Sequence, residues 1–436
     1  MQKIAIITLG CPKNTVEAEY LLGIFQNQGF EITNDLYEAN IAIIHTCSFI
    51  KSAKKESEVC IRNVLDVKKK TGLRVYVSGC LPQLLKEKMS LLFPDVDGFV
   101  GTGTLNKLQN IIFNKSFDEL LLPPGGLNNS KYRLLSSNIP STYLKIAEGC
   151  RHRCSFCIIP TLRGNYESRT IESVVNEAKI LAENGIKELI LIAQDTTSYG
   201  GDIYGAFVLD KLLVKLSKIK ELKWIRLLYA HPSSITDNLL SVFKEHKNIC
   251  GYMDIPMQHS SKNILLKMRR PLDTVAIVEK IKNVLPDIVL RTSIITGFPG
   301  ETKKDVNELI DFLNQGYFLY VGVFEYSNQK EADSSKLQKH IDAAIVKKRR
   351  TLIENAQYKV FKSKIYEKRN NITDLFVENC FKKGDKYNIK GRSYFQSPEI
   401  DGNMILASDK PIDLYQFHKV KIKGVNGYNI KASLLD

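Results

Sequence analysis

Residues 143–164, YLKIAEGCRHRCSFCIIPTLRG, contain the feature that decides how the chain is organised. Cys150, Cys154 and Cys157 stand there in the spacing C-x3-C-x2-C. Thiolates are soft ligands for iron, zinc or copper(I), so three of them in one short loop can surround a single metal centre. A structural zinc site normally has four ligands. Three thiolates on a four-iron cluster would instead leave one iron open to a substrate or cofactor.

This cysteine spacing, with the aromatic Phe156 directly before the last cysteine, resembles the signature of the radical S-adenosylmethionine (SAM) enzymes. The resemblance implies that Cys150, Cys154 and Cys157 hold a 4Fe–4S cluster and that Phe156 lies in the cofactor site. It also implies that the free iron binds the amino and carboxylate groups of SAM, whose reduction yields a 5′-deoxyadenosyl radical. A zinc loop or a chance group of cysteines is the alternative.

The length and composition predict a globular protein of two to four domains. The chain has 436 residues, of which 44% are apolar, enough for several cores. It contains no run of about 18 apolar residues, so we expect no membrane span. Met1 leads within a few residues into a strand-like segment, so we expect no secretory signal. Nine cysteines then indicate the reducing cytoplasm and roles as ligands rather than disulfides.

The charge of the chain suits a partner that carries negative charge. The net charge is +15, which is typical of proteins that contact nucleic acid or ribosomes. A lysine-rich proteome would explain the same excess equally well, so the charge alone does not select a function.

Residues 1–125 predict an α/β domain with a parallel sheet. Apolar runs at 3–10, 41–47 and 74–80 alternate with helical patterns at 14–28 and 52–70. Continuous apolar strands between helices are typical of a parallel sheet that is covered on both faces.

Each of these strands ends in a cysteine, namely Cys11, Cys47 or Cys80. The carboxyl ends of neighbouring parallel strands lie at one edge, where open α/β sheets bind ligands. We therefore expect the three thiols to converge on a second metal site with an open position. The alternative is that each is a small buried residue. Core or surface positions are expected for the remaining cysteines, Cys60, Cys250 and Cys380.

Three motifs, TLGCPKN at 8–14, HTCSF at 45–49 and SGC at 78–80, resemble the N-terminal domain of the radical-SAM methylthiotransferases. The resemblance implies that Cys11, Cys47 and Cys80 bind an auxiliary 4Fe–4S cluster that carries the sulfur to be donated. The MiaB-like branch modifies isopentenyl-adenosine in tRNA and begins with a GCQMN-type loop. The RimO-like branch modifies an aspartate of ribosomal protein uS12 and begins GCPKN, as this chain does. The following Glu17-Ala18-Glu19 departs from the common Asp-Ser-Glu run, and we assign it no catalytic role.

Residues 126–141, with clustered Gly, Asn and Ser, predict a linker to a second α/β domain at 142–335. Its six strand candidates, separated by helical patterns, are 142–147, 188–194, 224–230, 252–257, 289–297 and 320–326. They predict a partial βα barrel of six units, with the active site at the carboxyl ends of the strands. The cysteine loop follows the first of these strands and therefore falls at that edge.

Other residues at the same edge are expected to contact SAM. Gln194 and Arg291 lie at strand ends, and Gly297 and Gly300 belong to a GFPGE segment that resembles the family's glycine-containing SAM motif. A structural ion pair is the alternative role for Arg291. We expect His152, inside the cysteine loop, to point to solvent. Further polar residues expected to line the mouth are Asp195, Tyr229, His231, Gln258, His259 and Thr296.

Residues 336–369 predict a basic helical connector, with 11 basic and three acidic residues. It could contact RNA, or it could be a solvated helix face. Residues 370–436 show short alternating runs between turn residues, typical of a small antiparallel β-barrel. This part resembles the TRAM domain, which implies that it holds the target. Glu399 and Asp401 would complement a basic ribosomal protein.

Together these features predict a radical-SAM methylthiotransferase that adds a methylthio group to the β-carbon of an aspartate in uS12. The resemblance implies two 4Fe–4S clusters, two SAM molecules with different tasks and an electron donor. No acid or base residue is expected, because acid–base side chains cannot break an unactivated C–H bond. Both cysteine triads should face one cavity. The alternatives are tRNA methylthiolation and a non-catalytic iron–sulfur protein that transfers electrons or senses redox state.

Overall fold

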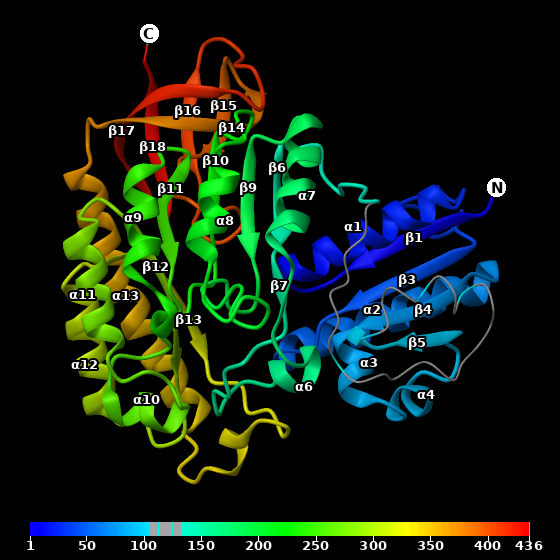
Figure 1. The fold of residues 1–436 in the computed structure, drawn as a ribbon. Coiled ribbons are helices and arrows are strands. Elements are labelled where there is room, and N and C mark those ends of the chain that lie inside the picture. Colours follow the sequence, from blue (N-terminus) through cyan, green and yellow to red (C-terminus); the bar gives the residue numbers. More distant parts are fainter. Residues whose placement is uncertain (104–107, 109–111, 113–123, 125–131, 436) are drawn as a thin grey trace.

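The computed structural model describes residues 1–103, 108, 112, 124 and 132–435. It contains an N-terminal α/β part, a central sheet with helices on its outer face, and a C-terminal β-barrel (Figure 1). Most of the final segment of the predicted 1–125 domain, and residues 126–131 of the predicted linker, lie outside the described residues.

The N-terminal sheet is parallel, with the strand order β2-β1-β3-β4-β5. Its strands are β1 (Lys3–Thr8), β2 (Glu31–Ile32), β3 (Ile41–Thr46), β4 (Arg74–Gly79) and β5 (Gly98–Val100). Its helices are α1 (Pro12–Asn27), α2 (Lys51–Thr71), α3 (Cys80–Leu85) and α4 (Lys88–Leu92). All residues of β3 are buried, as expected for a central strand covered on both faces. The predicted parallel α/β fold is confirmed.

The central sheet is also parallel, with the order β13-β12-β11-β10-β9-β6, which confirms the six-unit partial barrel. The strands are β6 (Ser141–Lys145), β9 (Glu188–Ile192), β10 (Trp224–Leu227), β11 (Ile249–Asp254), β12 (Val289–Thr296) and β13 (Phe318–Glu325). The outer helices are α7 (Ile171–Glu183), α8 (Leu209–Leu216), α9 (Asp237–Glu245), α11 (Thr274–Val284) and α12 (Lys303–Asn314). The short elements are β7 (Ala147–Glu148), α6 (Ile159–Arg163), β8 (Glu167–Ser168), η2 (Pro232–Ser234), α10 (Lys262–Met268) and η3 (Asp333–Lys336).

Alternating strand residues divide the central apolar packing into two faces. Leu189, Leu191 and Leu227 pack beneath the outer helices, whereas Ile190 and Ile192 belong to a second cluster that α1, α13 and the C-terminal barrel share. This alternation follows from the two-residue period of a strand, and it lets one sheet bury both of its faces.

The basic segment forms a long helix, α13 (Ala343–Glu367), which packs against α12, β13 and β17. Ile353 and Phe361 are buried on one side, and Lys347 and Lys348 are exposed on the other. Within the described part of the chain, no helix combines the length and the apolar character needed to cross a membrane.

The C-terminal part is a closed barrel of β14 (Ile372–Lys383), β15 (Lys386–Arg392), β16 (Met404–Ser408), β18 (Asn429–Leu434) and β17 (Phe417–Asn426), in that order around the barrel. Four pairings are antiparallel, and the β16–β18 pairing is parallel. The predicted small barrel is thus present, and one parallel pair completes its closure.

The barrel covers the ends at which the central strands begin (Figure 1). Trp224, the first residue of β10, packs on Phe376 and Phe417, with ring centroids 6.1 and 4.8 Å apart. Glu188, the first residue of β9, forms ion pairs with Arg226 and with Arg392 of β15. The amino ends of the strands are therefore closed, and the carboxyl ends remain for the cysteine loop and the N-terminal part.

Glu188 is fully buried, and its charge depends on the two arginines. Burial alone would raise the pKa of this carboxyl group, but Arg392 and Arg226 outweigh burial and lower the pKa to about 2. A buried carboxylate in this environment stabilises the docked barrel as long as it stays ionised.

Replacing Glu188 with Gln is expected to lower the free energy of unfolding at pH 7 by about 3 kcal/mol, the value of a pKa change from 4.5 to about 2. Because the folded pKa is depressed, this stabilisation is fully present above the unfolded pKa of 4.5 and is lost as the pH falls toward 2. Urea unfolding at pH 7 and pH 3 measures the difference between the variant and the wild-type chain. An equal difference at both pH values would contradict the assignment.

The matched control is Glu354→Gln, which removes the half-exposed ion pair with Arg350. A surface pair contributes less than about 1 kcal/mol, so this variant should change the unfolding free energy little at either pH.

Candidate active site

The cysteine loop lies at the carboxyl end of β6 and is held by backbone hydrogen bonds. The Cys150 N–H donates to the Gly164 carbonyl (3.3 Å), and the Ser155 N–H donates to the Met268 carbonyl (3.0 Å). The three cysteines line a cavity of about 790 Å³. The loop therefore has a fixed backbone while its thiols face open space.

Burial keeps two thiols of this loop protonated, so they become thiolate ligands only when a metal replaces the proton. Burial raises the pKa of Cys150 to about 11 and that of Cys157 to about 12. The Arg270 guanidinium lies 3.9 Å from the Cys154 sulfur and also donates to the Pro256 carbonyl. Metal binding replaces the thiol proton, so an iron group would supply the charge that burial otherwise opposes.

The thiols of each triad are spaced more widely than the ligands of a single tetrahedral ion. In a tetrahedral zinc site with Zn–S bonds of about 2.3 Å, sulfur atoms lie about 3.8 Å apart. No three cysteine sulfurs in the described ranges lie within 4.8 Å of one another. Neither triad is therefore closed around one ion. A four-iron cluster binds each thiolate through a separate iron and therefore does not require the three sulfurs to lie that close together.

The prediction that His152 points to solvent is wrong. Its ring stacks on His231, with centroids 3.6 Å apart, and its Nε2 lies 2.7 Å from Asp195 Oδ2. Burial would raise the pKa of Asp195, but hydrogen bonds from His152 and Ser198 outweigh it and lower the pKa to about 2. A buried carboxylate attracts a hydrogen-bond donor, so the strand end at Asp195 anchors the middle of the cysteine loop.

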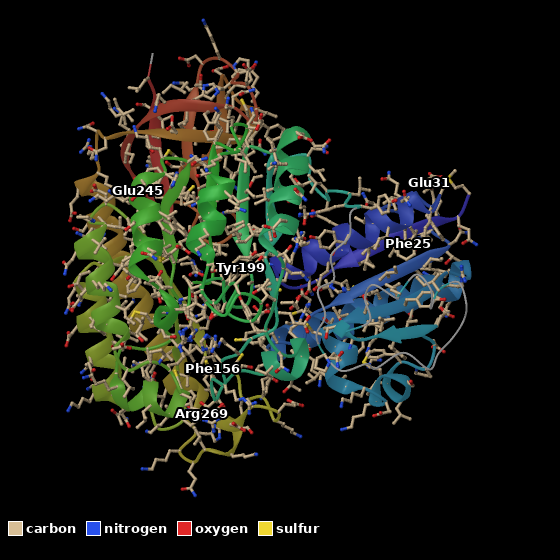
Figure 2. The ribbon with its side chains drawn as sticks, viewed as in Figure 1. Phe25, Glu31, Phe156, Tyr199, Glu245 and Arg269 are labelled. Carbon is tan, nitrogen blue, oxygen red and sulfur yellow. The ribbon has the colours of Figure 1, made fainter. Side chains whose placement is uncertain are left out.

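Among the residues predicted to bind SAM, Gln194 and Phe156 lie near the loop. Gln194 donates to Glu148, and its own Oε1 is a buried acceptor that has no partner among the described residues. Phe156 packs in a small apolar cluster with Met268 and Phe298. Figure 2 places Phe156 at the end of the molecule where the central strands finish. The free Gln194 acceptor fits a cofactor that carries an N–H or O–H donor.

The predicted glycines lie against protein side chains. Gly297 and Gly300 have φ of 81° and 79°, a region that favours glycine. A Cβ at Gly297 would lie 2.5 Å from Val346 of α13, and one at Gly300 would lie 2.8 Å from the Lys267 amine. The close approach at Gly297 is thus made by α13.

Arg291 and Asp401 form a buried ion pair inside the partial barrel. Arg291 Nη1 lies 2.8 Å from Asp254 Oδ1, and its Nε lies 3.2 Å from Asp401 Oδ1. The Tyr252 hydroxyl also donates to Asp401. Asp401 is therefore turned inward and does not present its charge to a surface partner, because a carboxylate so deeply buried requires a counter-charge. Glu399 is exposed.

Cys11, Cys47 and Cys80 lie together at the carboxyl edge of the N-terminal sheet. Cys47 and Cys80 directly follow the paired strands β3 and β4, and Cys11 precedes α1. Gly10 has φ of 97°, and a Cβ there would lie 2.4 Å from the Cys47 Cβ, so only glycine fits. Burial raises the pKa of Cys80 to about 12. The residues fit a second group that replaces the thiol protons.

The two triads adjoin each other across α6, which follows Cys157. Ile158 and Leu162 pack against Cys80 in one apolar cluster. Arg163, the last residue of α6, donates to Asn14 Oδ1 (2.6 Å), three residues after Cys11. In Figure 1, α6 lies between the central sheet and the N-terminal part. The auxiliary triad is therefore not on a distant face of the molecule.

Glu17 of α1 is a functional residue that the sequence analysis missed. Its carboxylate accepts from Lys145 Nζ (2.8 Å) and Arg163 Nη1 (2.6 Å), and lies 3.0 Å from His45 Nε2. All these side chains are at most 3% exposed. No catalytic role was expected for the 17–19 run, and none is needed, because this carboxylate joins the two domains. The partners of Glu17 are far apart from it in sequence. The one signal in the sequence was that Glu17 lies on the same face of α1 as buried apolar residues.

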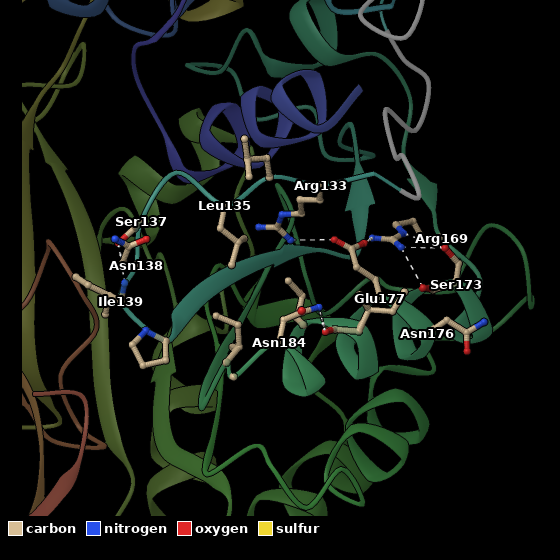
Figure 3. A pocket seen from close by; sticks show the side chains of 16 residues that line it. Arg133, Leu135, Ser137, Asn138, Ile139, Arg169, Ser173, Asn176, Glu177 and Asn184 are labelled. Atoms are coloured by element: carbon tan, nitrogen blue, oxygen red, sulfur yellow. Dashed lines mark hydrogen bonds and ion pairs between the residues drawn. The ribbon is translucent and has the colours of Figure 1, made fainter. Parts of the chain in front are cut away.

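A second cavity, of about 780 Å³, lies between residues 133–140 and α7 (Figure 3). Its charged groups are paired: Glu177 lies 2.9 Å from Arg133 and 2.6 Å from Arg169, and Arg133 also lies 2.6 Å from Glu19. None of the six candidate cysteine ligands lines it, so we assign it no part in the active site.

Comparisons with known proteins agree with this three-part architecture. Residues 3–101 match the "Uncharacterized protein family UPF0004" model, residues 144–313 match the "Radical SAM superfamily" model, and residues 372–435 match the "TRAM domain" model. A relative from Endomicrobium trichonymphae, "Ribosomal protein uS12 methylthiotransferase RimO", is 71% identical over 99% of this chain and 98% of its own. The relative of the same name from Clostridioides difficile is 38% identical over 100% and 99%.

This chain belongs to the RimO family of uS12 methylthiotransferases.

A solved structure supports the fold of this family member. The chain resembles a radical S-adenosylmethionine methyltransferase, TsrM from Kitasatospora setae, with a TM-score of 0.58 and 14% identity over 77% of each chain. At this identity the likeness concerns the fold alone. Family membership identifies the chain as a radical-SAM methylthiotransferase.

Replacing Glu17 with Ala in this family member is expected to destabilise the folded chain by about 3–5 kcal/mol, because buried Lys145 and Arg163 lose a shared counter-charge. Amide hydrogen exchange of α1 and α6 should increase, since the carboxylate joins these two helices. Urea unfolding and exchange mass spectrometry measure the two effects.

The control is Glu31→Ala, which removes a 51% exposed carboxylate beside Lys3 and should change stability by less than about 0.5 kcal/mol. Unchanged exchange in α6 of the Glu17 variant would contradict the role of Glu17 in joining the domains.

Proposed function

We propose that this chain transfers a methylthio group to the β-carbon of an aspartate in ribosomal protein uS12. The observation that carries this proposal is the meeting of two three-cysteine sites across α6. One site would bind the cluster that cleaves SAM reductively to a radical, and the other would bind the group that carries the transferred sulfur. The full-length similarity to uS12 methylthiotransferases supports the target.

The proposed ligands divide into two sets with different tasks. Cys150, Cys154 and Cys157 would hold the 4Fe–4S cluster that binds SAM. The auxiliary cluster would be held by Cys11, Cys47 and Cys80. When bound, the clusters and SAM supply one-electron cleavage and the sulfur, chemistry that no side chain provides. An electron donor must supply the electrons.

The residues around the first cluster would then bind and orient SAM. Gln194 offers its free Oε1 to the amine of SAM, and Phe156 closes the apolar side of the site together with Phe298. Gly297 and Gly300 would place their backbone near the cofactor, with the first glycine also held against α13. Arg291 would support the SAM site indirectly, because its guanidinium group is already paired with Asp254 and Asp401.

The protein substrate would meet an acidic side chain on the C-terminal barrel. Glu399 is exposed, and its charge adds to burial in raising the pKa of Tyr143 on β6. We propose that Glu399 contacts the basic uS12 chain, and that Asp401 contributes to substrate binding by fixing Arg291. Charge complementarity of this kind mainly increases specificity and the rate of association.

The exposed lysines of α13 would contact ribosomal RNA around the target. Lys347, Lys348, Lys359 and Lys362 are exposed, whereas Val346, Ile353, Val360 and Phe361 of the same helix are buried. Such contacts would hold the enzyme on the ribosomal subunit in a salt-dependent manner. The same lysines would also suit tRNA, which is therefore the second candidate substrate. The similarity to uS12 methylthiotransferases favours uS12 instead.

The mass of uS12 from cells with and without this chain tests the proposal. The wild-type chain should add one methylthio group at one aspartate. Cys11→Ala should abolish the transfer, while the reduced enzyme still cleaves SAM to 5′-deoxyadenosine. Cys150→Ala should abolish both reactions, because the cluster that would bind SAM loses one of its three protein ligands. Mass spectrometry of uS12 and chromatography of 5′-deoxyadenosine measure these outcomes.

Cys60→Ala is the matched control, since this cysteine of α2 belongs to neither triad, and it should leave both reactions intact. Unmodified uS12 with methylthio-adenosine in tRNA would instead show a tRNA enzyme. Absence of SAM cleavage by the reduced wild-type chain would indicate a non-catalytic iron–sulfur protein.

A further inference from the structure

A buried lysine that has no carboxylate partner among the described residues lies between the auxiliary cysteines and the central barrel. Lys13 is in the first turn of α1, two residues after Cys11, and is 8% exposed. Its Nζ lies 3.3 Å from the centroid of the Tyr229 ring. Among the described residues, no carboxylate lies within ion-pair distance of this amine. Buried ammonium groups are normally paired with an anion, so the position requires an explanation.

The carboxylates nearest to Lys13 are already engaged. Glu148 binds Lys145 Nζ at 2.7 Å, and Asp254 binds Arg291 Nη1 at 2.8 Å. Either one could turn to Lys13 only by breaking an existing buried ion pair, which is strongly unfavourable. Apart from the Cys11 sulfur, which the proposed cluster would occupy, the described residues give this amine an aromatic face and no anion of its own.

The contact between Lys13 and the aromatic ring is built into the backbone. Tyr229 follows β10 and has φ of 60°, a conformation that tyrosine rarely adopts. Its N–H donates to Asp254 Oδ2 (3.1 Å), and the Ala230 N–H donates to the Asp254 carbonyl (2.8 Å). Such a backbone persists only where the surroundings hold it, and it is typical of functional sites.

We infer that Lys13 binds the side-chain carboxylate of the substrate aspartate and so selects an aspartate as the target. This inference rests on the proposed function, because the carbon that receives the sulfur is bonded directly to that carboxylate. Cys11, two residues away, would hold the sulfur-carrying group. An ion pair to Lys13 therefore places the β-carbon beside the sulfur donor, and positioning of this kind is a large part of catalysis.

The same contact explains selection against an uncharged target. A neutral group, such as an adenine base or an asparagine amide, would leave the Lys13 amine buried and unpaired. A site built for a charged partner discriminates strongly against an analogue that lacks the charge. Tyr229 would then limit the space in which the carboxylate can approach the amine.

The test uses the full chain with both clusters reconstituted, and uS12 that carries either the target aspartate or an asparagine in its place. The wild-type chain should bind the aspartate form on the order of 100-fold more tightly than the asparagine form. Lys13→Met keeps the length of the side chain and removes the charge, so it should bind both forms equally and weakly. Lys13→Arg should retain the preference. Fluorescence anisotropy with labelled uS12 measures binding independently of turnover.

The control Lys88→Met changes an exposed lysine on α4 and should bind like the wild-type chain. A preference for aspartate that survives in Lys13→Met would overturn the inference, as would weaker binding of SAM instead of uS12. Electron paramagnetic resonance shows whether the Met variant holds the auxiliary cluster, and if it does not, the Lys13→Arg variant decides the question. If that variant holds both clusters and has lost the preference for the aspartate form of uS12, the inference is overturned. Failure of the wild-type chain to bind or modify uS12 would overturn the proposed function itself.

Discussion

The buried carboxylate of Glu17 joins the N-terminal domain to the central barrel, and the active site depends on this interaction. Lys145 lies at the end of β6, before the cysteine loop, and Arg163 ends α6, after the loop. Both donate to the same carboxylate on α1. Glu17 therefore fixes both ends of the loop relative to α1, the helix that directly follows Cys11. Two buried cations around one anion are stable only while all three remain in place.

The two ends of the central sheet have different tasks. At the amino ends, Glu188, Trp224 and their partners on the C-terminal barrel close the structure by charge pairing and aromatic packing. At the carboxyl ends, several polar side chains are buried against one another. His152, for example, stacks on His231 and lies beside Asp195. Stability is thus concentrated away from the reaction, and the strand ends are left to bind cofactor and substrate, as in other βα barrels.

Much of this arrangement could be predicted from the sequence. Continuous apolar runs specify parallel strands, so both sheets and the convergence of Cys47 with Cys80 followed from strand order alone. The inward position of His152 could not be predicted, because it depends on an Asp195 side chain 43 residues away. The burial of Glu17 and Lys13 was missed for the same reason. Charged residues in a helix usually face solvent, and only the docking of two domains buries these.

The remaining residues show where a sequence pattern has more than one physical origin. The acidic segment at 399–401 suggested a surface for a basic partner, yet Asp401 completes a buried ion pair with Arg291. Gly297 suggested an approach by a cofactor, and the structure places Val346 against it. Glycine and aspartate serve packing and ligand binding by the same geometry, so sequence alone does not separate these roles.

The central claim is that the two cysteine triads hold neighbouring iron groups on one active site joined through Glu17 and α6. A crystal structure of the reconstituted chain, with anomalous diffraction measured at the iron edge, tests it most directly. The account predicts two iron clusters, one bound by Cys150, Cys154 and Cys157 and the other by Cys11, Cys47 and Cys80, with the open sides toward a shared cavity that Lys13 borders. A single cluster, or two clusters that open on opposite faces of α6, would contradict it.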